Sequence, residues 1–184
     1  MKIAIISSST RTGRQSHKVA LGLELALSKF EHISTEVIDL KAANLPVFED
    51  TMEKAITNKD EIQTLHAQLT SADALIVVTP EYNGNYSSAL QNMVDHYPKS
   101  TFAKKAVGIV TVTTGPLGGM RAALHLQQFI LAFGAIPSPQ MLLVATVQNK
   151  FDELGNLIDE NFSKNIQSFL NEFNWLANAL YNAK

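Results

Sequence analysis

The chain has 184 residues, 46% of them hydrophobic and 17% charged, so residues 1–184 can bury a core as a single globular domain. No apolar run approaches the roughly 20 residues that cross a bilayer, and no signal-peptide pattern opens the chain, so we expect a cytoplasmic protein without a membrane partner. A net charge of −2 gives no reason to expect a nucleic-acid partner, and the absence of cysteine excludes thiol nucleophiles, thiolate metal sites and redox dithiols.

Short branched apolar runs alternate with helical apolar stripes along the chain. We interpret the runs as buried strands and the stripes as amphipathic helices. In chain order, each predicted strand and the helix that follows it are Lys2–Ile6 with Val19–Phe30, Val37–Leu40 with Ile62–Ala72, Ala74–Val78 with Ala89–Tyr97, Val107–Val112 with Met120–Phe133, and Met141–Ala145 with Phe162–Leu180. Residues 42–50, with Pro46, are predicted as a connecting loop.

This alternation predicts an α/β domain of three layers with a doubly wound parallel sheet, because parallel strands need helical crossovers. Periodicity does not give the strand order. In either common order, ligands bind outside the carboxyl ends of the strands. Three loops therefore matter most: Ser7–Ser16, Thr79–Tyr86 and Thr113–Gly119.

The first loop has the composition of a phosphate site. Residues 1–23 contain four cationic side chains and no acidic one, and two of the cations, Arg11 and Arg14, lie in this loop. Hydroxyl groups, arginine forks and the amides of a helix start all favour an anion. The alternative is a solvated turn capped by Ser16. Dinucleotide and P-loop glycine patterns do not occur, and a thiol phosphatase is excluded, which leaves a phosphate carried by a mononucleotide.

The other two loops suit a planar ring. Thr79–Tyr86 combines proline, glycine and two tyrosines, which can hold a heterocycle, although a rigid turn against a neighbouring subunit is equally compatible. Thr113–Gly119 supplies three glycines where backbone could approach a ligand, or it is a flexible turn. Asp95 and Asp152 lack metal-ligand spacing, so no metal is expected.

Together these motifs resemble the NADPH-dependent FMN reductase family, a branch of the flavodoxin-like fold that includes quinone, azo-compound and chromate reductases. The resembling segments are Ser9–Ser16, Thr79–Gly84, Gly115–Arg121 and Phe151–Leu157. Two departures are Ser8, where many members have glycine, and Ser87, where many have proline.

The resemblance implies a flavodoxin-like sheet with strand order 2-1-3-4-5 that binds FMN. The residues implied to contact the FMN phosphate are Ser9, Arg11, Arg14 and Ser16. Those implied to line the flavin ring are Pro80, Glu81, Tyr82, Asn83, Gly84, Thr113, Thr114 and Gly115. It also implies NADPH or NADH as co-substrate, and a homodimer or homotetramer in which one subunit helps to wall the flavin of another.

The expected function is that of an FMN-dependent NAD(P)H oxidoreductase, in which hydride passes from nicotinamide to FMN and then to a small acceptor such as a flavin, quinone or azo compound. The cofactor carries this chemistry, so no catalytic side chain is assigned. A flavodoxin-type electron carrier is the alternative, although a net charge of −2 offers little field for docking a protein partner. A redox-inactive protein that has kept the fold also stays open.

Overall fold

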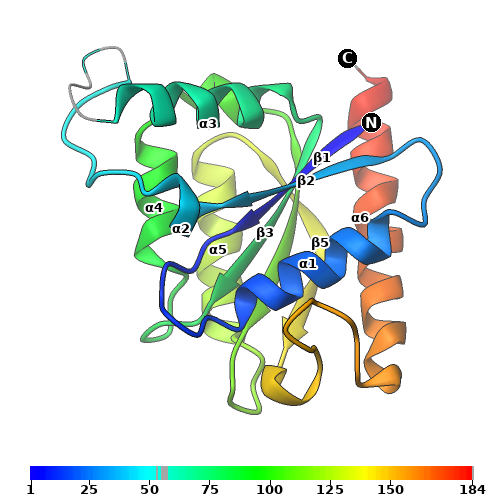
Figure 1. Ribbon diagram of the computed structural model, residues 1–184. Helices are drawn as coiled ribbons and strands as arrows, with labels where there is room; N and C mark the ends of the chain where they lie inside the picture. The colour runs from blue at the N-terminus through cyan, green and yellow to red at the C-terminus, as the bar shows by residue number, and fades with distance from the viewer. Residues whose placement is uncertain (53, 55–57, 184) are drawn as a thin grey trace.

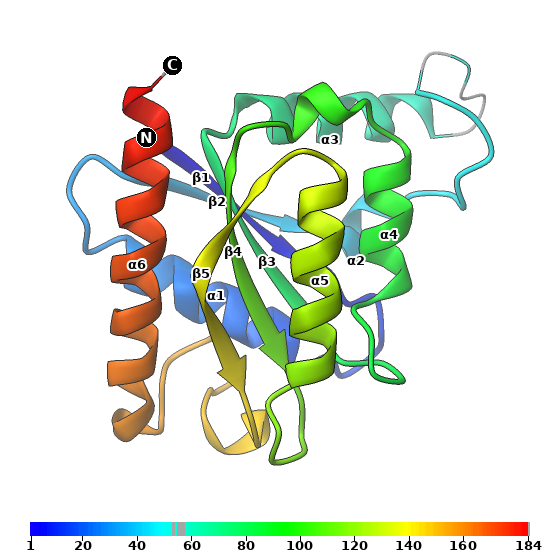
Figure 2. The ribbon, with the colours of Figure 1, turned by 180° about the vertical axis from the view of Figure 1, so that it is seen from behind.

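The structure, a computed structural model, describes residues 1–52, 54 and 58–183, and it forms one parallel sheet between two layers of helices (Figures 1 and 2). The strands are β1 (Lys2–Ser7), β2 (Ser34–Asp39), β3 (Ala74–Pro80), β4 (Ala106–Val112) and β5 (Ile136–Val144). The α-helices are α1 (Ser16–Leu27), α2 (Leu40–Ala43), α3 (Lys59–Ser71), α4 (Ser88–Asp95), α5 (Met120–Ala132) and α6 (Ser163–Asn182). Short 3₁₀ helices are η1 (Lys99–Thr101), η2 (Val147–Asn149) and η3 (Glu160–Phe162).

The strand order is β2-β1-β3-β4-β5, all parallel, which confirms the flavodoxin-like order. Every residue of β3 and β4 is buried, as expected for central strands covered on both faces. The edge strands β2 and β5 mix buried and exposed positions. The carboxyl ends of β1, β3 and β4 therefore meet in the middle of one edge of the sheet.

Helices α1 and α6 cover one face of the sheet, and α3, α4 and α5 cover the other (Figures 1 and 2). Each layer has its own apolar cluster. Alternate residues of a strand point to opposite faces, so Ile3 and Ile5 join the α1/α6 cluster while Ala4 and Ile6 join the other.

Several predicted boundaries differ from the structure. β2 runs from Ser34 because its pairing with β1 begins there, and Leu40 opens the unpredicted helix α2 after Asp39, whose side chain accepts a hydrogen bond from the Lys41 amide at 2.9 Å. β5 begins at Ile136 rather than Met141 and contains two prolines, which an edge strand tolerates. Among the described residues, no helix has both the length and the apolar character needed to cross a membrane.

The chain after β5 packs directly on the backbone of α1. A Cβ atom on Gly22 would lie 2.6 Å from the Phe151 ring and 2.7 Å from the Gly155 carbonyl oxygen. On the same side, Lys18 pairs with Glu153 at 2.6 Å. Helix α1, which begins at the end of the first loop, is thus held in place by close packing of Gly22 against residues 151–155.

We predict that Gly22→Ala lowers the free energy of unfolding by up to about 2 kcal/mol. Overpacking costs about 1–3 kcal/mol, and a backbone carbonyl cannot turn aside as a side chain can, so this cost exceeds the roughly 1 kcal/mol gained by replacing glycine with alanine in a helix. Urea unfolding measures the difference. Leu25→Ala on the same helix is the control, because Leu25 is 47% exposed and its loss should matter little. An unchanged midpoint for Gly22→Ala would show that the loop can retreat freely.

Candidate functional site

The three loops converge on a cavity of about 280 Å³ at the carboxyl ends of β1, β3 and β4. Nine of the twelve predicted site residues line it: Ser9, Arg11, Arg14, Ser16, Pro80, Glu81, Tyr82, Thr113 and Thr114. Asn83 lines an adjoining hollow of about 640 Å³ together with Arg11, Glu81 and Tyr82. Gly84 and Gly115 shape the loops that carry these side chains.

The start of α1 has the character of an anion site. Its first turn holds no acidic residue, and Gln15 at the N-cap position makes no side-chain capping bond. The Lys18 amide donates to the Gln15 carbonyl at 3.1 Å, and the two helix amides before it, at Ser16 and His17, have no side-chain cap among the described residues. Ser16 Oγ is buried and finds no hydrogen-bond partner among the described residues. A buried hydroxyl without a partner is costly in a folded protein. Both features call for an acceptor such as a phosphate oxygen.

An ion pair fixes this loop to the end of β2. Arg14 donates from both terminal nitrogens to the two carboxylate oxygens of Asp39, with Nη2–Oδ2 at 2.5 Å, and Nη1 also donates to the Ser9 carbonyl at 2.9 Å. Three of its five N–H donors are thus engaged. Arg14 lines the cavity, but its first role in the fold is to hold the loop.

The electrostatics of this corner follow from the pair. Burial raises the pKa of the Asp39 carboxyl, but hydrogen bonds from Arg14 and the Lys41 amide, with the Arg14 charge, outweigh it, so the pKa lies below its ordinary value. Burial and the Arg14 charge lower the pKa of His17. The His17 ring, whose Nδ1 lies 3.0 Å from Ser7 Oγ, is therefore neutral near pH 7.

A tight hairpin forms one side of the cavity. Tyr82 and Asn85 exchange backbone hydrogen bonds of 2.8 and 3.0 Å, and the two residues between them both have positive φ, 53° at Asn83 and 79° at Gly84. Asparagine followed by glycine is favoured in such two-residue turns because both positions need the left-handed region. The hairpin is fixed to the first loop by the 2.8 Å contact between Tyr82 Oη and Ser9 Oγ, and Arg11 lies over the Tyr82 ring at 5.5 Å from its centroid.

The loop after β4 is held by η2 and the residue before it. The Thr113 carbonyl accepts from the Val147 amide at 3.2 Å, and the Gly115 carbonyl accepts from the Thr146 amide at 3.1 Å. Val147 also lines the cavity, which sequence reasoning missed because it lies far along the chain in a segment without a motif. The apolar Val147 and Val112 next to polar loops suit one edge of a planar heterocycle.

Comparison with known proteins identifies the family. The family model of NADPH-dependent FMN reductases matches residues 1–149. The chain belongs to the NADPH-dependent FMN reductase family. It is 28% identical to the NAD(P)H-dependent FMN reductase of Pseudomonas aeruginosa, over 92% of this chain and 91% of that protein, and 27% identical to a quinone reductase of Escherichia coli, over 94% and 93%. A solved structure, the flavoenzyme FerB, an NAD(P)H:(acceptor) oxidoreductase from Paracoccus denitrificans, shares the fold with a TM-score of 0.78 at 21% identity, covering 95% of this chain and 96% of that one.

As a member of the NADPH-dependent FMN reductase family, the protein is an oxidoreductase that uses FMN and NAD(P)H. The chain's own residues fit FMN. The unpartnered Ser16 Oγ and the free amides at the start of α1 suit its phosphate, and the cavity between the hairpin and Val147 suits its ring.

Ser8 and Ser87, the two departures from the family pattern, contact each other in the structure. Ser87 Oγ lies 2.9 Å from both Ser8 Oγ and the Ser8 carbonyl oxygen, and the Ser87 amide donates to Thr79 Oγ1 at 3.0 Å. Ser87 is also the N-cap of α4, since its hydroxyl accepts from the Leu90 amide at 3.3 Å. A serine at each position thus supplies a buried contact between the first and second loops, which glycine and proline would lack.

We predict that Asp39→Asn destabilises the protein by about 1–2 kcal/mol at pH 7, the scale of a charged hydrogen bond that is only partly buried. Because the pKa of Asp39 is lower in the folded than in the unfolded state, the pair stabilises the fold above the unfolded pKa of about 4. This contribution is lost as pH falls through the folded pKa.

Urea unfolding from pH 7 to pH 3 provides the test, with Glu172→Gln, an exposed carboxylate of α6, as the matched control. The stability gap between wild type and Asp39→Asn should close at the acid end. A gap that stays constant with pH would mean that the carboxylate charge contributes nothing.

Proposed function

We propose that the FMN phosphate binds at the start of α1 and that the flavin ring lies between the hairpin and the loop after β4. The residues assigned to the phosphate are Ser9, Arg11, Arg14 and Ser16, and those assigned to the ring are Pro80, Glu81, Tyr82, Asn83, Gly84, Thr113, Thr114 and Gly115. The observation that carries this proposal is the buried Ser16 hydroxyl without a partner, at a helix start that has no cap.

Each residue near the phosphate has a donor to offer. A hydroxyl has one donor and two acceptor positions, so Ser9 can accept from Tyr82 while it donates to phosphate. Arg11 is exposed and reaches over the Tyr82 ring, which places its charge at the mouth of the cavity. Arg14 has two N–H donors beyond those that hold Asp39 and Ser9.

Bound FMN would supply the redox chemistry between NAD(P)H and the acceptor, and the residues assigned above would hold its phosphate and its ring. The protein's own part is to bind the cofactor, to orient it toward its substrates and to shield it from water. The hairpin is rigid because its turn is hydrogen-bonded and its tyrosine is anchored, so it can present a fixed wall to one edge of the ring. The adjoining hollow of about 640 Å³, lined by Tyr82 and Tyr86, leaves space for a second planar molecule.

We infer that the acceptor is a small planar molecule such as a quinone or an azo compound. The quinone reductase of Escherichia coli supports this inference, as do the aromatic side chains of the adjoining hollow. A cytoplasmic location and a homodimer or homotetramer are further parts of the proposal. Exposed apolar side chains on one helix, α5, support an assembly of subunits: Met120, Leu124 and Leu131.

We predict that Ser16→Ala weakens FMN binding by about 1.5–3 kcal/mol, the scale of a hydrogen bond to a charged group. The apoprotein should lose little stability, because this hydroxyl has no partner there to lose. Fluorescence titration with FMN measures the affinity, and riboflavin, which has no phosphate, is the control ligand. Equal losses for FMN and riboflavin would contradict a phosphate contact at Ser16.

We predict that purified protein loaded with FMN shows the visible flavin band and that NADPH or NADH bleaches it on stopped-flow mixing. Reoxidation by a quinone should follow. A flavin band that neither nicotinamide bleaches would favour the electron carrier, and the failure of FMN to bind at all would contradict the assignment of the site.

A further inference from the structure

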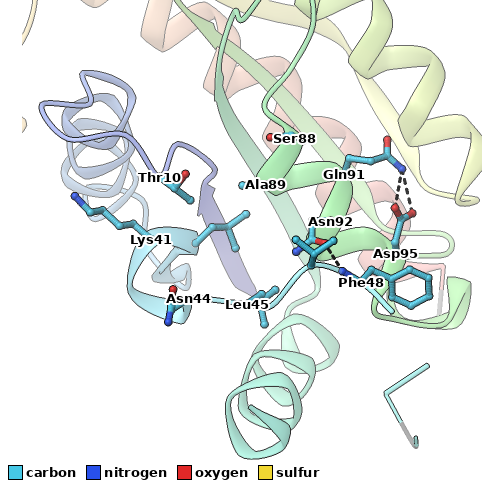
Figure 3. Close-up of a pocket in the computed structure, with 12 residues that line it drawn as sticks. Thr10, Lys41, Asn44, Leu45, Phe48, Ser88, Ala89, Gln91, Asn92 and Asp95 are labelled. Atoms are coloured by element: carbon cyan, nitrogen blue, oxygen red, sulfur yellow. Dashed lines mark hydrogen bonds between the residues drawn. The ribbon is translucent and has the colours of Figure 1, made fainter. Parts of the chain in front are cut away.

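A second large hollow lies next to Thr10 of the first loop (Figure 3). It has a volume of about 770 Å³ and runs between α2, residues 44–48 and α4. Thr10, which precedes Arg11 in the first loop, forms part of its rim. We call this hollow the α2/α4 groove. Its volume is in the range of small-molecule sites.

The groove adjoins the flavin site through one intermediate hollow. The flavin cavity and the adjoining 640 Å³ hollow share Arg11, Glu81 and Tyr82, and that hollow shares Ser88 with the α2/α4 groove. A bound molecule longer than one ring system can therefore extend from the flavin, across the start of α4, into the groove.

One wall of the groove is fixed in place by α4. The side chain of Asn92 makes two hydrogen bonds of 2.8 Å to this segment: its Oδ1 accepts from the Phe48 backbone N–H, and its Nδ2 donates to the Pro46 carbonyl. His96 Nε2 lies 3.1 Å from the same carbonyl oxygen, and the Phe48 ring stands edge-on to the imidazole with centroids 5.5 Å apart. Residues 46–48 are thus clasped to the helix, so the groove exists before any ligand enters.

The lining has a distinct chemical character. Leu40, Leu45 and Ala89 give apolar walls, and Lys41 lies at the rim near Thr10 (Figure 3). Lys41 is exposed, and no carboxylate in the described part of the chain forms an ion pair with its ammonium group. The acidic residue of the groove, Asp95, accepts two hydrogen bonds from Gln91 at the opposite end. Among the described residues, the groove therefore combines apolar walls with a rim lysine that forms no ion pair.

The space beside the flavin indicates which ligand this groove would take. The cavity of about 280 Å³ is assigned to FMN and the adjoining hollow of about 640 Å³ to a planar molecule at the flavin, so the far half of a dinucleotide needs a further surface. Resting on the flavin site proposed above, we propose that the α2/α4 groove binds the adenosine half of NAD(P)H and that Lys41 contacts the 2′-phosphate of NADPH. Adenine is planar and largely apolar, which suits the leucine and alanine walls, and an exposed lysine ammonium is a suitable point charge for a phosphate.

Binding of adenosine fragments to FMN-loaded protein tests the groove without turnover. Calorimetry should show that adenosine 2′,5′-bisphosphate binds the wild type and that Lys41→Ala weakens it roughly tenfold. Adenosine 5′-monophosphate, which lacks the 2′-phosphate, should bind both proteins alike. Ala89→Phe, which fills the apolar slot, should weaken both fragments. Lys29→Ala, an exposed lysine beyond the end of α1, is the control and should change neither.

Steady-state kinetics give a second, independent reading. Lys41→Ala should raise KM for NADPH roughly tenfold while KM for NADH stays within about twofold. Ala89→Phe should raise KM for both dinucleotides but not for reduced nicotinamide mononucleotide, which has no adenosine. The flavin absorbance of each variant reports that the FMN site is intact.

The proposal is overturned if neither substitution changes the affinity for adenosine 2′,5′-bisphosphate, or if Lys41→Ala affects NADPH and NADH equally. Either result with a normal flavin band and normal bleaching by NAD(P)H would leave the FMN site standing. Absence of flavin binding in the wild type would instead remove the flavin site itself.

Discussion

The site depends on a partly buried ion pair between Arg14 and Asp39. The first loop has no regular structure of its own, yet it must present donors to a ligand at the centre of the sheet edge. Register places Ser7 beside Asp39, so the carboxylate emerges next to the point where the loop begins. The arginine fork spans both carboxylate oxygens and the Ser9 carbonyl, which fixes the loop at two points at once. Ser9 then carries the connection to the Tyr82 hairpin.

The pair also shapes how the site attracts an anion. Asp39 offsets much of the Arg14 charge, so attraction rests on Arg11, the free amides of α1 and neutral hydroxyls such as Ser16. Oriented dipoles in a partly enclosed site act strongly at short range and fade with distance. On the proposed assignment, this is how a chain with a net charge of −2 would hold a phosphate without a broad basic surface. It also favours a ligand that fits the loop over anions in general.

The sequence was sufficient for the layers, the parallel sheet and the convergence of the three loops, because continuous apolar runs and helical stripes report burial directly. The strand order came through the family resemblance instead, since periodicity carries no information about which strands pair. The four-residue helix α2 was missed because it is too short to show a helical stripe. The first half of β5 was not predicted as strand because it contains Pro137 and Pro139. Prolines are tolerated in a strand at the edge of a sheet, and the sequence alone does not show that β5 is an edge strand.

At the site, local motifs predicted which residues gather but not how they bond to one another. The ion pair of Arg14 with Asp39 was not predicted, because Asp39 lies 25 residues away on a different strand. Val147 could not be predicted as a site residue, because no motif surrounds it. It reaches the cavity only because η2 packs against the loop after β4. The same limit hid the contact between Ser8 and Ser87, which lie 79 residues apart.

The proposed flavin cavity and the hollow that adjoins it are built differently, in keeping with the different molecules that each would bind. At the flavin end, hydrogen bonds fix every loop to another loop or strand, so a tightly held cofactor would lose little free energy to ordering the protein. At the adjoining hollow, two tyrosines line a larger space together with polar side chains, which suits molecules that arrive and leave in turn. A nicotinamide and an acceptor that exchange at one flavin face need shape tolerance more than tight contacts. A rigid cofactor cradle beside a permissive exchange surface is therefore what two-step reduction through a bound flavin requires.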